Sequence, residues 1–146
     1  MSTQIDPRGP QFAAALTSVA LAVTLLTAPG TAGVVLLAWQ TAVFAVGAGL
    51  GVQRTPYAWV FRTFVRPRLS APIDLEDPAP PRFAQAVGLG FVVVGLLGYL
   101  SGVDLVGAIA VGLALAAALL NAVFGFCLGC EIYLQAKRVS ARTVAN

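Results

Sequence analysis

Residues 9–53 read GPQFAAALTSVALAVTLLTAPGTAGVVLLAWQTAVFAVGAGLGVQ and contain no charged side chain. A helix needs about 20 apolar residues to cross a bilayer, so this run is long enough for two spans. The pair Pro29-Gly30 divides the run, because proline cannot continue a helix and glycine accepts a positive φ. The run therefore predicts two transmembrane helices, near 11–28 and 32–52. A cleaved signal peptide is the competing interpretation, but a second apolar segment follows after a very short turn.

Two further charge-free runs, 83–103 and 105–130, predict the same arrangement in the second half of the chain. Only 10% of the residues are charged and 58% are hydrophobic, whereas a soluble domain carries roughly 25% charged residues. We therefore expect an all-α polytopic membrane protein, with its third and fourth spans near 83–101 and 104–126. Residues 1–146 are treated as one membrane domain.

The basic residues predict how the chain is oriented. Lysine and arginine near spans mark the cytoplasmic side of a membrane. The two short connections, 28–31 and 100–104, carry none of them. We therefore expect both termini and the segment between spans two and three on the cytoplasmic side of a bacterial plasma membrane. The +3 net charge then reflects orientation and attraction to anionic lipid, and no nucleic-acid partner is expected.

The sequence contains an internal similarity. DPRGPQFAAA (6–15) aligns with DPAPPRFAQA (77–86) at a shift of 71, with six of ten positions identical. Each copy precedes a predicted hairpin, so we predict two halves, 1–70 and 71–146, with the same orientation as a parallel repeat. The alternative is that both copies are simply good helix starts, because aspartate caps a helix and proline suits its first turn.

The segment RTPYAWVFRTFVRPRL (54–69) is predicted to form an amphipathic helix at the membrane interface. Its apolar residues recur at the spacing of one helical face. This face consists of Tyr57, Val60, Phe61, Phe64 and Val65. Aromatic and basic side chains suit the depth of the lipid headgroups. The residues assigned to the interface are Tyr57, Trp59, Arg62, Arg66 and Arg68.

The only two cysteines, Cys127 and Cys130, lie in FCLGCEIY (126–133) at C-x-x-C spacing. Three interpretations stay open: packing residues, metal ligands, or a redox pair. A structural zinc site needs four ligands. The chain offers two thiolates, Glu131 and no histidine, so a metal would require a two-fold dimer. No metal or cofactor is assigned, and nothing resembles a nucleotide loop or a catalytic triad.

A redox role depends on where the fourth helix ends. In a regular helix, Cβ atoms three residues apart lie about 5–6 Å apart, whereas a disulfide wants about 3.8 Å. The C-terminal end of a helix also disfavours a thiolate. A break at Gly125 would start a new helix beside Cys127. The two cysteines would then no longer lie within one regular helix, and Cys127 would lie at a helix N-terminus. Arg54 is then the predicted thiolate-stabilising cation, because the repeat places it at Gly125. The hypothesis fails if the helix runs unbroken through Cys130 with Arg54 remote.

Two polar side chains, Gln40 and Asn121, lie within the predicted spans. We expect them to donate hydrogen bonds across helices, worth about 0.6–2 kcal/mol each. A substrate path is the alternative. No charge lies within a span, so ion-coupled transport has no obvious carrier. The many glycines permit close helix packing or a homo-oligomer, and the sequence does not choose between them.

Three stretches resemble one family: IDPRGPQFAAALT (5–17), TPYAWVFRTFVRPRL (55–69) and GFCLGCEIY (125–133). It is the domain-of-unknown-function family DUF4395, small four-span membrane proteins of bacteria, notably actinobacteria. The resemblance covers nearly the whole chain. Members are encoded, in some genomes, beside thioredoxin-like and rhodanese-like proteins. The resemblance therefore implies a link to thiol redox or sulfur transfer, with Cys127 and Cys130 as the functional pair.

We therefore expect a thiol–disulfide or sulfur-relay partner of a soluble thioredoxin-like or rhodanese-like protein. Cys127 would attack or receive sulfur, Cys130 would resolve, and Arg54 would favour the thiolate. One alternative is a transporter for a small sulfur compound, with a polar path past Gln40 and Asn121. Another is a non-enzymatic membrane scaffold whose cysteines are structural.

Overall fold

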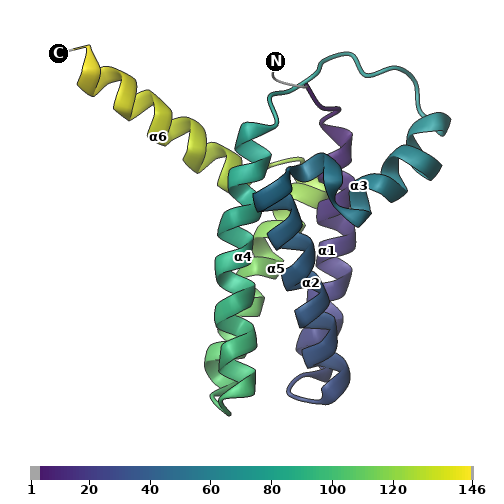
Figure 1. Ribbon diagram of the computed structural model, residues 1–146, viewed down its shortest axis with the longest axis vertical. Helices are drawn as coiled ribbons and strands as arrows, with labels where there is room; N and C mark the ends of the chain where they lie inside the picture. Colours follow the sequence, from purple (N-terminus) through teal and green to yellow (C-terminus); the bar gives the residue numbers. More distant parts are fainter. Residues whose placement is uncertain (1–3, 146) are drawn as a thin grey trace.

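The computed structural model describes residues 4–145, and four long helices form its body (Figure 1). All four are long and apolar enough to cross a membrane, and each boundary lies within four residues of its predicted position. The prediction of an all-α polytopic membrane protein is confirmed. The four helices are α1 (Arg8–Thr27), α2 (Thr31–Leu50), α4 (Ala79–Leu100) and α5 (Asp104–Phe124).

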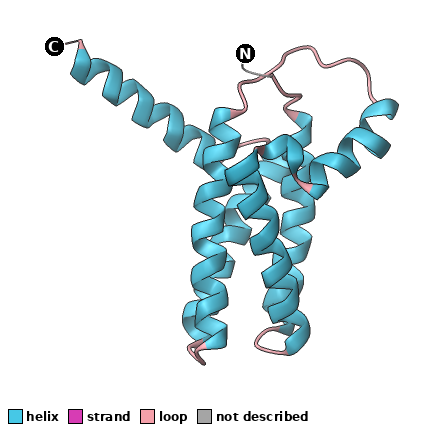
Figure 2. Cartoon of the chain, in the orientation of Figure 1, coloured by secondary structure: helices cyan, strands magenta, loops and turns pink. Residues whose placement is uncertain are grey.

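The two ends of the bundle differ in charge and in content. One end holds only the short turns after α1 and after α4 (Figure 2). The other end holds the N-terminal segment, α3 (Pro56–Val60), the linker before α4, and α6 (Leu128–Val144). We call this second end the basic end, because every lysine and arginine lies there. They are Arg8, Arg54, Arg62, Arg66, Arg68, Arg82, Lys137, Arg138 and Arg142.

The bundle has an apolar core and also leaves many large apolar residues on its outside. α1 and α4 each pack against both α2 and α5. The core holds Leu21, Leu37, Val92 and Val111, all fully buried. Many large apolar side chains along the same helices are exposed, as a hydrocarbon environment requires. α4 and α5 approach so closely that a Cβ on Gly98 would lie 2.6 Å from the nitrogen of Gly107.

The segment after α2 is helical, as predicted, but its winding changes along its length. α3 continues into a π-helical turn, Phe61–Val65, whose hydrogen bonds reach five residues instead of four. The predicted apolar face is therefore divided. Phe61 is buried and packs against Phe12, with ring centroids 5.7 Å apart. Phe64 is half exposed and meets Trp59 edge to face.

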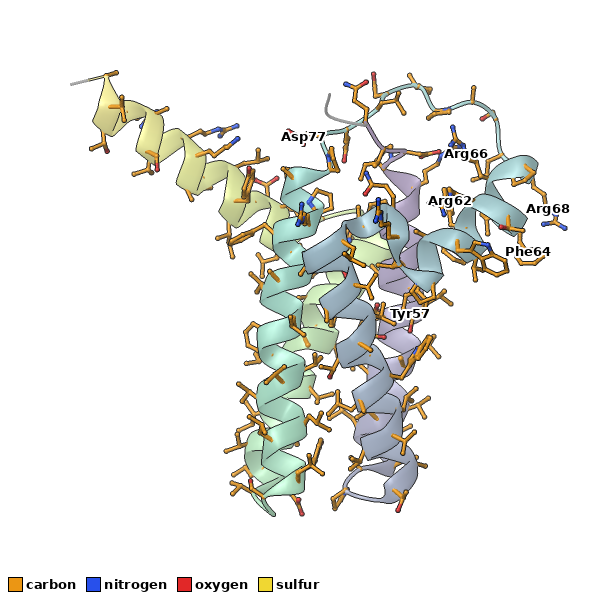
Figure 3. All side chains as sticks on the ribbon, in the orientation of Figure 1. Tyr57, Arg62, Phe64, Arg66, Arg68 and Asp77 are labelled. Atoms are coloured by element: carbon orange, nitrogen blue, oxygen red, sulfur yellow. A yellow bond between two sulfur atoms is a disulfide. The ribbon has the colours of Figure 1, made fainter. Side chains whose placement is uncertain are left out.

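Tyr57, which is half-buried, is hydrogen-bonded to the bundle (Figure 3). Its hydroxyl donates to Oε1 of Gln40 at 2.8 Å and accepts from Nε1 of Trp39 at 3.2 Å. Gln40 is fully buried, and its Nε2 donates to Oγ1 of Thr17 at 3.2 Å. The predicted hydrogen bond from Gln40 across helices is therefore confirmed, and it joins α1 to α2. The contact between Tyr57 and Gln40 was not predicted from the sequence, and the assignment of Tyr57 to the membrane interface stays a prediction.

Removing the Tyr57 hydroxyl is expected to destabilise the bundle. In Tyr57→Phe, the buried Oε1 of Gln40 loses its donor, which should lower the free energy of unfolding by about 1–2 kcal/mol. Titration of the detergent-solubilised protein with sodium dodecyl sulfate measures the loss. Trp59→Phe is the control, because Trp59 is exposed in the same segment. Equal destabilisation by the two variants would contradict the prediction.

Equivalent positions of the two predicted halves make equivalent contacts at the basic end. Asp6 accepts a hydrogen bond from the N–H of Arg8 at 3.0 Å, and Asp77 accepts one from the N–H of Ala79 at 2.8 Å. α1 and α4 therefore begin in the same way. The N-terminal segment is tied to the linker by an antiparallel backbone pair between Ile5 and Glu76. The duplication itself stays a prediction.

Candidate redox site

The two cysteines lie where the chain leaves the bundle. α5 ends at Phe124, and Gly125 takes the left-handed backbone conformation, with φ of 66°. Such a residue ends a helix, and glycine adopts it without a Cβ clash. A new helix, α6, then begins at Leu128. The predicted break at Gly125 is confirmed.

Cys127 caps the N-terminus of α6, and Cys130 lies in its first turn. The Sγ of Cys127 accepts a hydrogen bond from the N–H of Cys130 at 3.3 Å. The two cysteines form a disulfide, with their Cα atoms 5.2 Å apart. Both side chains are partly exposed. In the reduced protein the same N–H group and the helix dipole would stabilise a thiolate on Cys127.

The other half of the chain has an ordinary cap at the matching place. Thr55 precedes α3, and its Oγ1 accepts the N–H of Ala58 at 3.2 Å, again three residues on. At the shift of 71, Cys127 aligns with Pro56, whereas the cap of α3 is Thr55. The two capping residues are therefore one position out of register with the alignment. Serine, threonine, aspartate and asparagine are the favoured caps. Capping alone therefore does not account for a cysteine at position 127.

The first half of α6 is held against α4. A Cβ on Gly129 would lie 2.7 Å from both Cα and Cβ of Ala84, so the two helices nearly touch there. The rings of Phe83 and Tyr133 follow, with centroids 5.6 Å apart. The second half of α6 projects away from the bundle (Figure 1). This contact fixes the position of the cysteines relative to the spans.

A cavity of about 300 Å³ lies beside the disulfide, between α1, α2, α4, α5 and the start of α6. Cys127 forms part of its wall. Most of the lining is apolar, and its polar side chains are Thr17, Gln85 and Asn121. The side chain of Asn121 makes no hydrogen bond with residues 4–145, so its predicted bond across helices is not seen. Instead, Asn121 brings a free amide to the cavity that Cys127 lines.

The other predicted site residues lie elsewhere at the basic end. Arg54 sits in a short 3₁₀ turn after α2, with an exposed side chain that makes no ion pair or hydrogen bond to the described residues. It does not line the cavity beside Cys127, and its role as a thiolate stabiliser stays a prediction. Trp59, Arg62, Arg66 and Arg68 are all exposed. Arg62 and Arg66 line a second cavity, which is described below.

Two anchoring residues were missed by the sequence reasoning. Nε2 of Gln11 donates to the carbonyl of Ala122 at 3.2 Å, near the end of α5. The guanidinium of Arg82 donates to the carbonyls of Ala48 and Gly49 at 2.7 Å, at the end of α2. These carbonyls lack helical partners, so both side chains complete a helix end. Gln11 and Arg82 occupy the same position of the predicted repeat, which was the available signal.

No metal centre is formed by the part of the chain that the structure describes: residues 4–145 contain no group of three or more metal-ligating side chains. Glu131, in the first turn of α6, is exposed. The two sulfur atoms of the candidate site are joined in a disulfide.

Comparison with known proteins gives one match. A family model described as a domain of unknown function, DUF4395, matches residues 5–138. No curated protein and no solved structure matches the chain. The matched region contains all four spans, α3 and both cysteines. The chain therefore belongs to the DUF4395 family.

Proposed function

We propose that the protein is a membrane-embedded thiol–disulfide exchange or sulfur-relay protein, with Cys127 and Cys130 as its reversible pair. The observation that carries the proposal is the position of the pair in the first turn of α6. The sulfur of Cys127 takes the capping role that the hydroxyl of Thr55 has in the other half. A pair at a helix N-terminus has an activated first thiol and a neighbouring thiol that can resolve.

The proposed orientation places this pair on the cytoplasmic side of the plasma membrane. Both termini, α3, α6 and every basic residue share the basic end of the bundle. Cytoplasmic flanks of spans carry the excess of lysine and arginine. A soluble thioredoxin-like or rhodanese-like protein in the cytoplasm is then the proposed partner.

The exchange proceeds in two steps. In the reduced protein, the Cys127 thiolate attacks one sulfur of the partner's disulfide, and the partner's other sulfur leaves as a thiolate. The thiol of Cys130 then loses its proton to water and attacks the sulfur of Cys127. The Cys127–Cys130 disulfide closes, and the partner's first sulfur leaves as a thiolate. Two electrons have passed to the partner, and the reverse reaction returns them.

A persulfide donor would react at the same sulfur. The Cys127 thiolate would take the terminal sulfur of the donor, and the donor would leave as a thiolate. The cavity supports either use, because Cys127 forms part of its wall and is partly exposed. A purely structural cysteine would be enclosed by its neighbours instead.

Thiol trapping in intact cells tests the proposal. Cys127 and Cys130 are alkylated with a mass-tagged reagent, with and without prior reduction, using a membrane-permeant and an impermeant form. We expect a pair that becomes labelled only after reduction, and only by the permeant reagent. The Cys127→Ser/Cys130→Ser double variant is the unlabelled control. Two thiols that stay unlabelled until the protein is denatured would contradict the proposal and favour the scaffold interpretation.

A further inference from the structure

A second cavity lies at the basic end and shares Pro10, Thr17 and Gln85 with the cavity beside the cysteines. It measures about 280 Å³ and is lined by the N-terminal segment, α1, α2, α3, the π-helical turn, the linker and the start of α4. Two arginines, Arg62 and Arg66, contribute to its wall, together with the polar side chains of Gln53, Tyr57 and Gln85. Pockets for drug-sized ligands measure about 300–1,000 Å³, so the size favours a small ligand or a small headgroup.

The charge of this cavity is not balanced by the protein. Its one acidic side chain, Asp6, is already engaged by Arg8: Nη2 lies 2.8 Å from Oδ2, and Nε lies 3.0 Å from Oδ1. These hydrogen bonds hold the pKa of Asp6 below its usual range, which keeps the pair ionised. Within residues 4–145, neither Arg62 nor Arg66 forms an ion pair. Two positive charges therefore remain in the wall.

Two of the three arginines in this segment line the cavity. Arg62 and Arg66 lie toward α1, whereas Arg68 points away from the bundle (Figure 3). Arg62 donates to the backbone carbonyl of Gln53, and this hydrogen bond directs its guanidinium along the cavity wall. Arg68 donates to the carbonyl of Phe64 and does not line the cavity. Three arginines in seven residues thus divide into two that face the cavity and one that does not.

We propose that this cavity binds a small oxyanion of the sulfate or phosphate type, held by the guanidinium groups of Arg62 and Arg66. Guanidinium groups match the paired oxygens of such anions. The amides of Gln53 and Gln85 supply further donors from the same wall. The anion is either free in the cytoplasm or the phosphate of an anionic lipid, since both present the same oxygens. The site goes beyond the proposed thiol chemistry and does not depend on it.

Thermal unfolding of the purified protein in a non-ionic detergent tests the site. Sodium sulfate and sodium phosphate are compared with sodium chloride at equal ionic strength. We expect sulfate or phosphate to raise the unfolding midpoint of the parent protein and of Arg68→Gln. The Arg62→Gln/Arg66→Gln double variant should lose this shift. Arg68→Gln is the matched control for each single variant, Arg62→Gln and Arg66→Gln, because all three remove one charge from the same segment.

Two outcomes would overturn the proposal. In the first, neither sulfate nor phosphate raises the unfolding midpoint of the parent protein. In the second, Arg68→Gln reduces this rise as much as Arg62→Gln or Arg66→Gln does. If the double variant does not fold, Arg62→Lys/Arg66→Lys replaces it, and a weakened shift is expected. Nanodiscs of phosphatidylcholine, with and without phosphatidylglycerol, separate the two sources. If phosphatidylglycerol abolishes the effect of sulfate on the unfolding midpoint, the site binds a lipid headgroup. If the effect of sulfate persists, the site binds a free anion.

Discussion

Replacing Cys127 by serine is expected to slow the reaction of the reduced protein with a small disulfide at pH 7 by at least about tenfold, relative to Cys130→Ser. Only Cys127 sits at the cap of α6, where the N–H of Cys130 points at its sulfur. An ordinary cysteine has a pKa near 8.5, and a helix N-terminus lowers it to as little as about 3.5–7.5. A lowered pKa raises the thiolate fraction at pH 7 above the few per cent of an ordinary thiol, and the thiolate is the attacking form.

The serine variant tests chemistry without removing the cap. Serine is a favoured N-cap, so α6 is expected to start at the same place. Reaction with 5,5′-dithiobis(2-nitrobenzoic acid), followed by stopped-flow absorbance, gives the two rates. Thr55→Ser is the control for a change at the matching cap of α3, and it should leave both cysteines as reactive as in the parent. Equal rates in Cys127→Ser and Cys130→Ser would contradict the assignment of Cys127 as the attacking thiol.

Replacing Gly98 by leucine is expected to abolish the folded bundle. A Cβ at this position would lie 2.6 Å from the backbone nitrogen and 3.0 Å from the Cα of Gly107. Backbone atoms cannot rotate away as a side chain can, so α4 and α5 would have to separate. Overpacking of a core costs about 1–3 kcal/mol and occasionally more, and a backbone clash belongs at the upper end.

Gly90→Leu is the matched control on the same helix. Nothing lies within 4 Å of the Cβ that this change adds, so the variant should fold as the parent does. The yield of monodisperse protein in size-exclusion chromatography, and its unfolding midpoint, distinguish the two variants. An equal loss of folded protein in Gly90→Leu would show that the clash with Gly107 is not the cause.

The spans were predictable from the sequence, and their contacts were not. A hydrocarbon layer excludes charge, so charge-free runs alone place four helices to within four residues. The break at Gly125 was also predictable, because glycine accepts the left-handed conformation and regular helix resists a C-x-x-C disulfide. The inward turn of Tyr57 was missed, since its partner Gln40 is 17 positions earlier in the chain. Helical periodicity carries no signal for such a contact.

The candidate site shows the same limit. The spacing of Cys127 and Cys130 identified the pair, but it gave no sign of the cavity beside them, which depends on residues from five helices. Arg62 and Arg66 were assigned to the interface together with Arg68 because all three share one basic segment. Only Arg62 and Arg66 line the second cavity. Its other walls come from the N-terminal segment, α1 and α2, which the pattern of one basic segment does not place.

The way α6 is attached has a consequence for amide hydrogen exchange. None of its side chains is buried, and its contacts with α4 belong to its first half. An isolated helix of this length is marginal in water, so the second half should open and close independently of the bundle. Its amide protons are then expected to exchange with deuterium far faster than those of the spans. The disulfide thus stands at the boundary between a cooperative unit and a segment that opens locally.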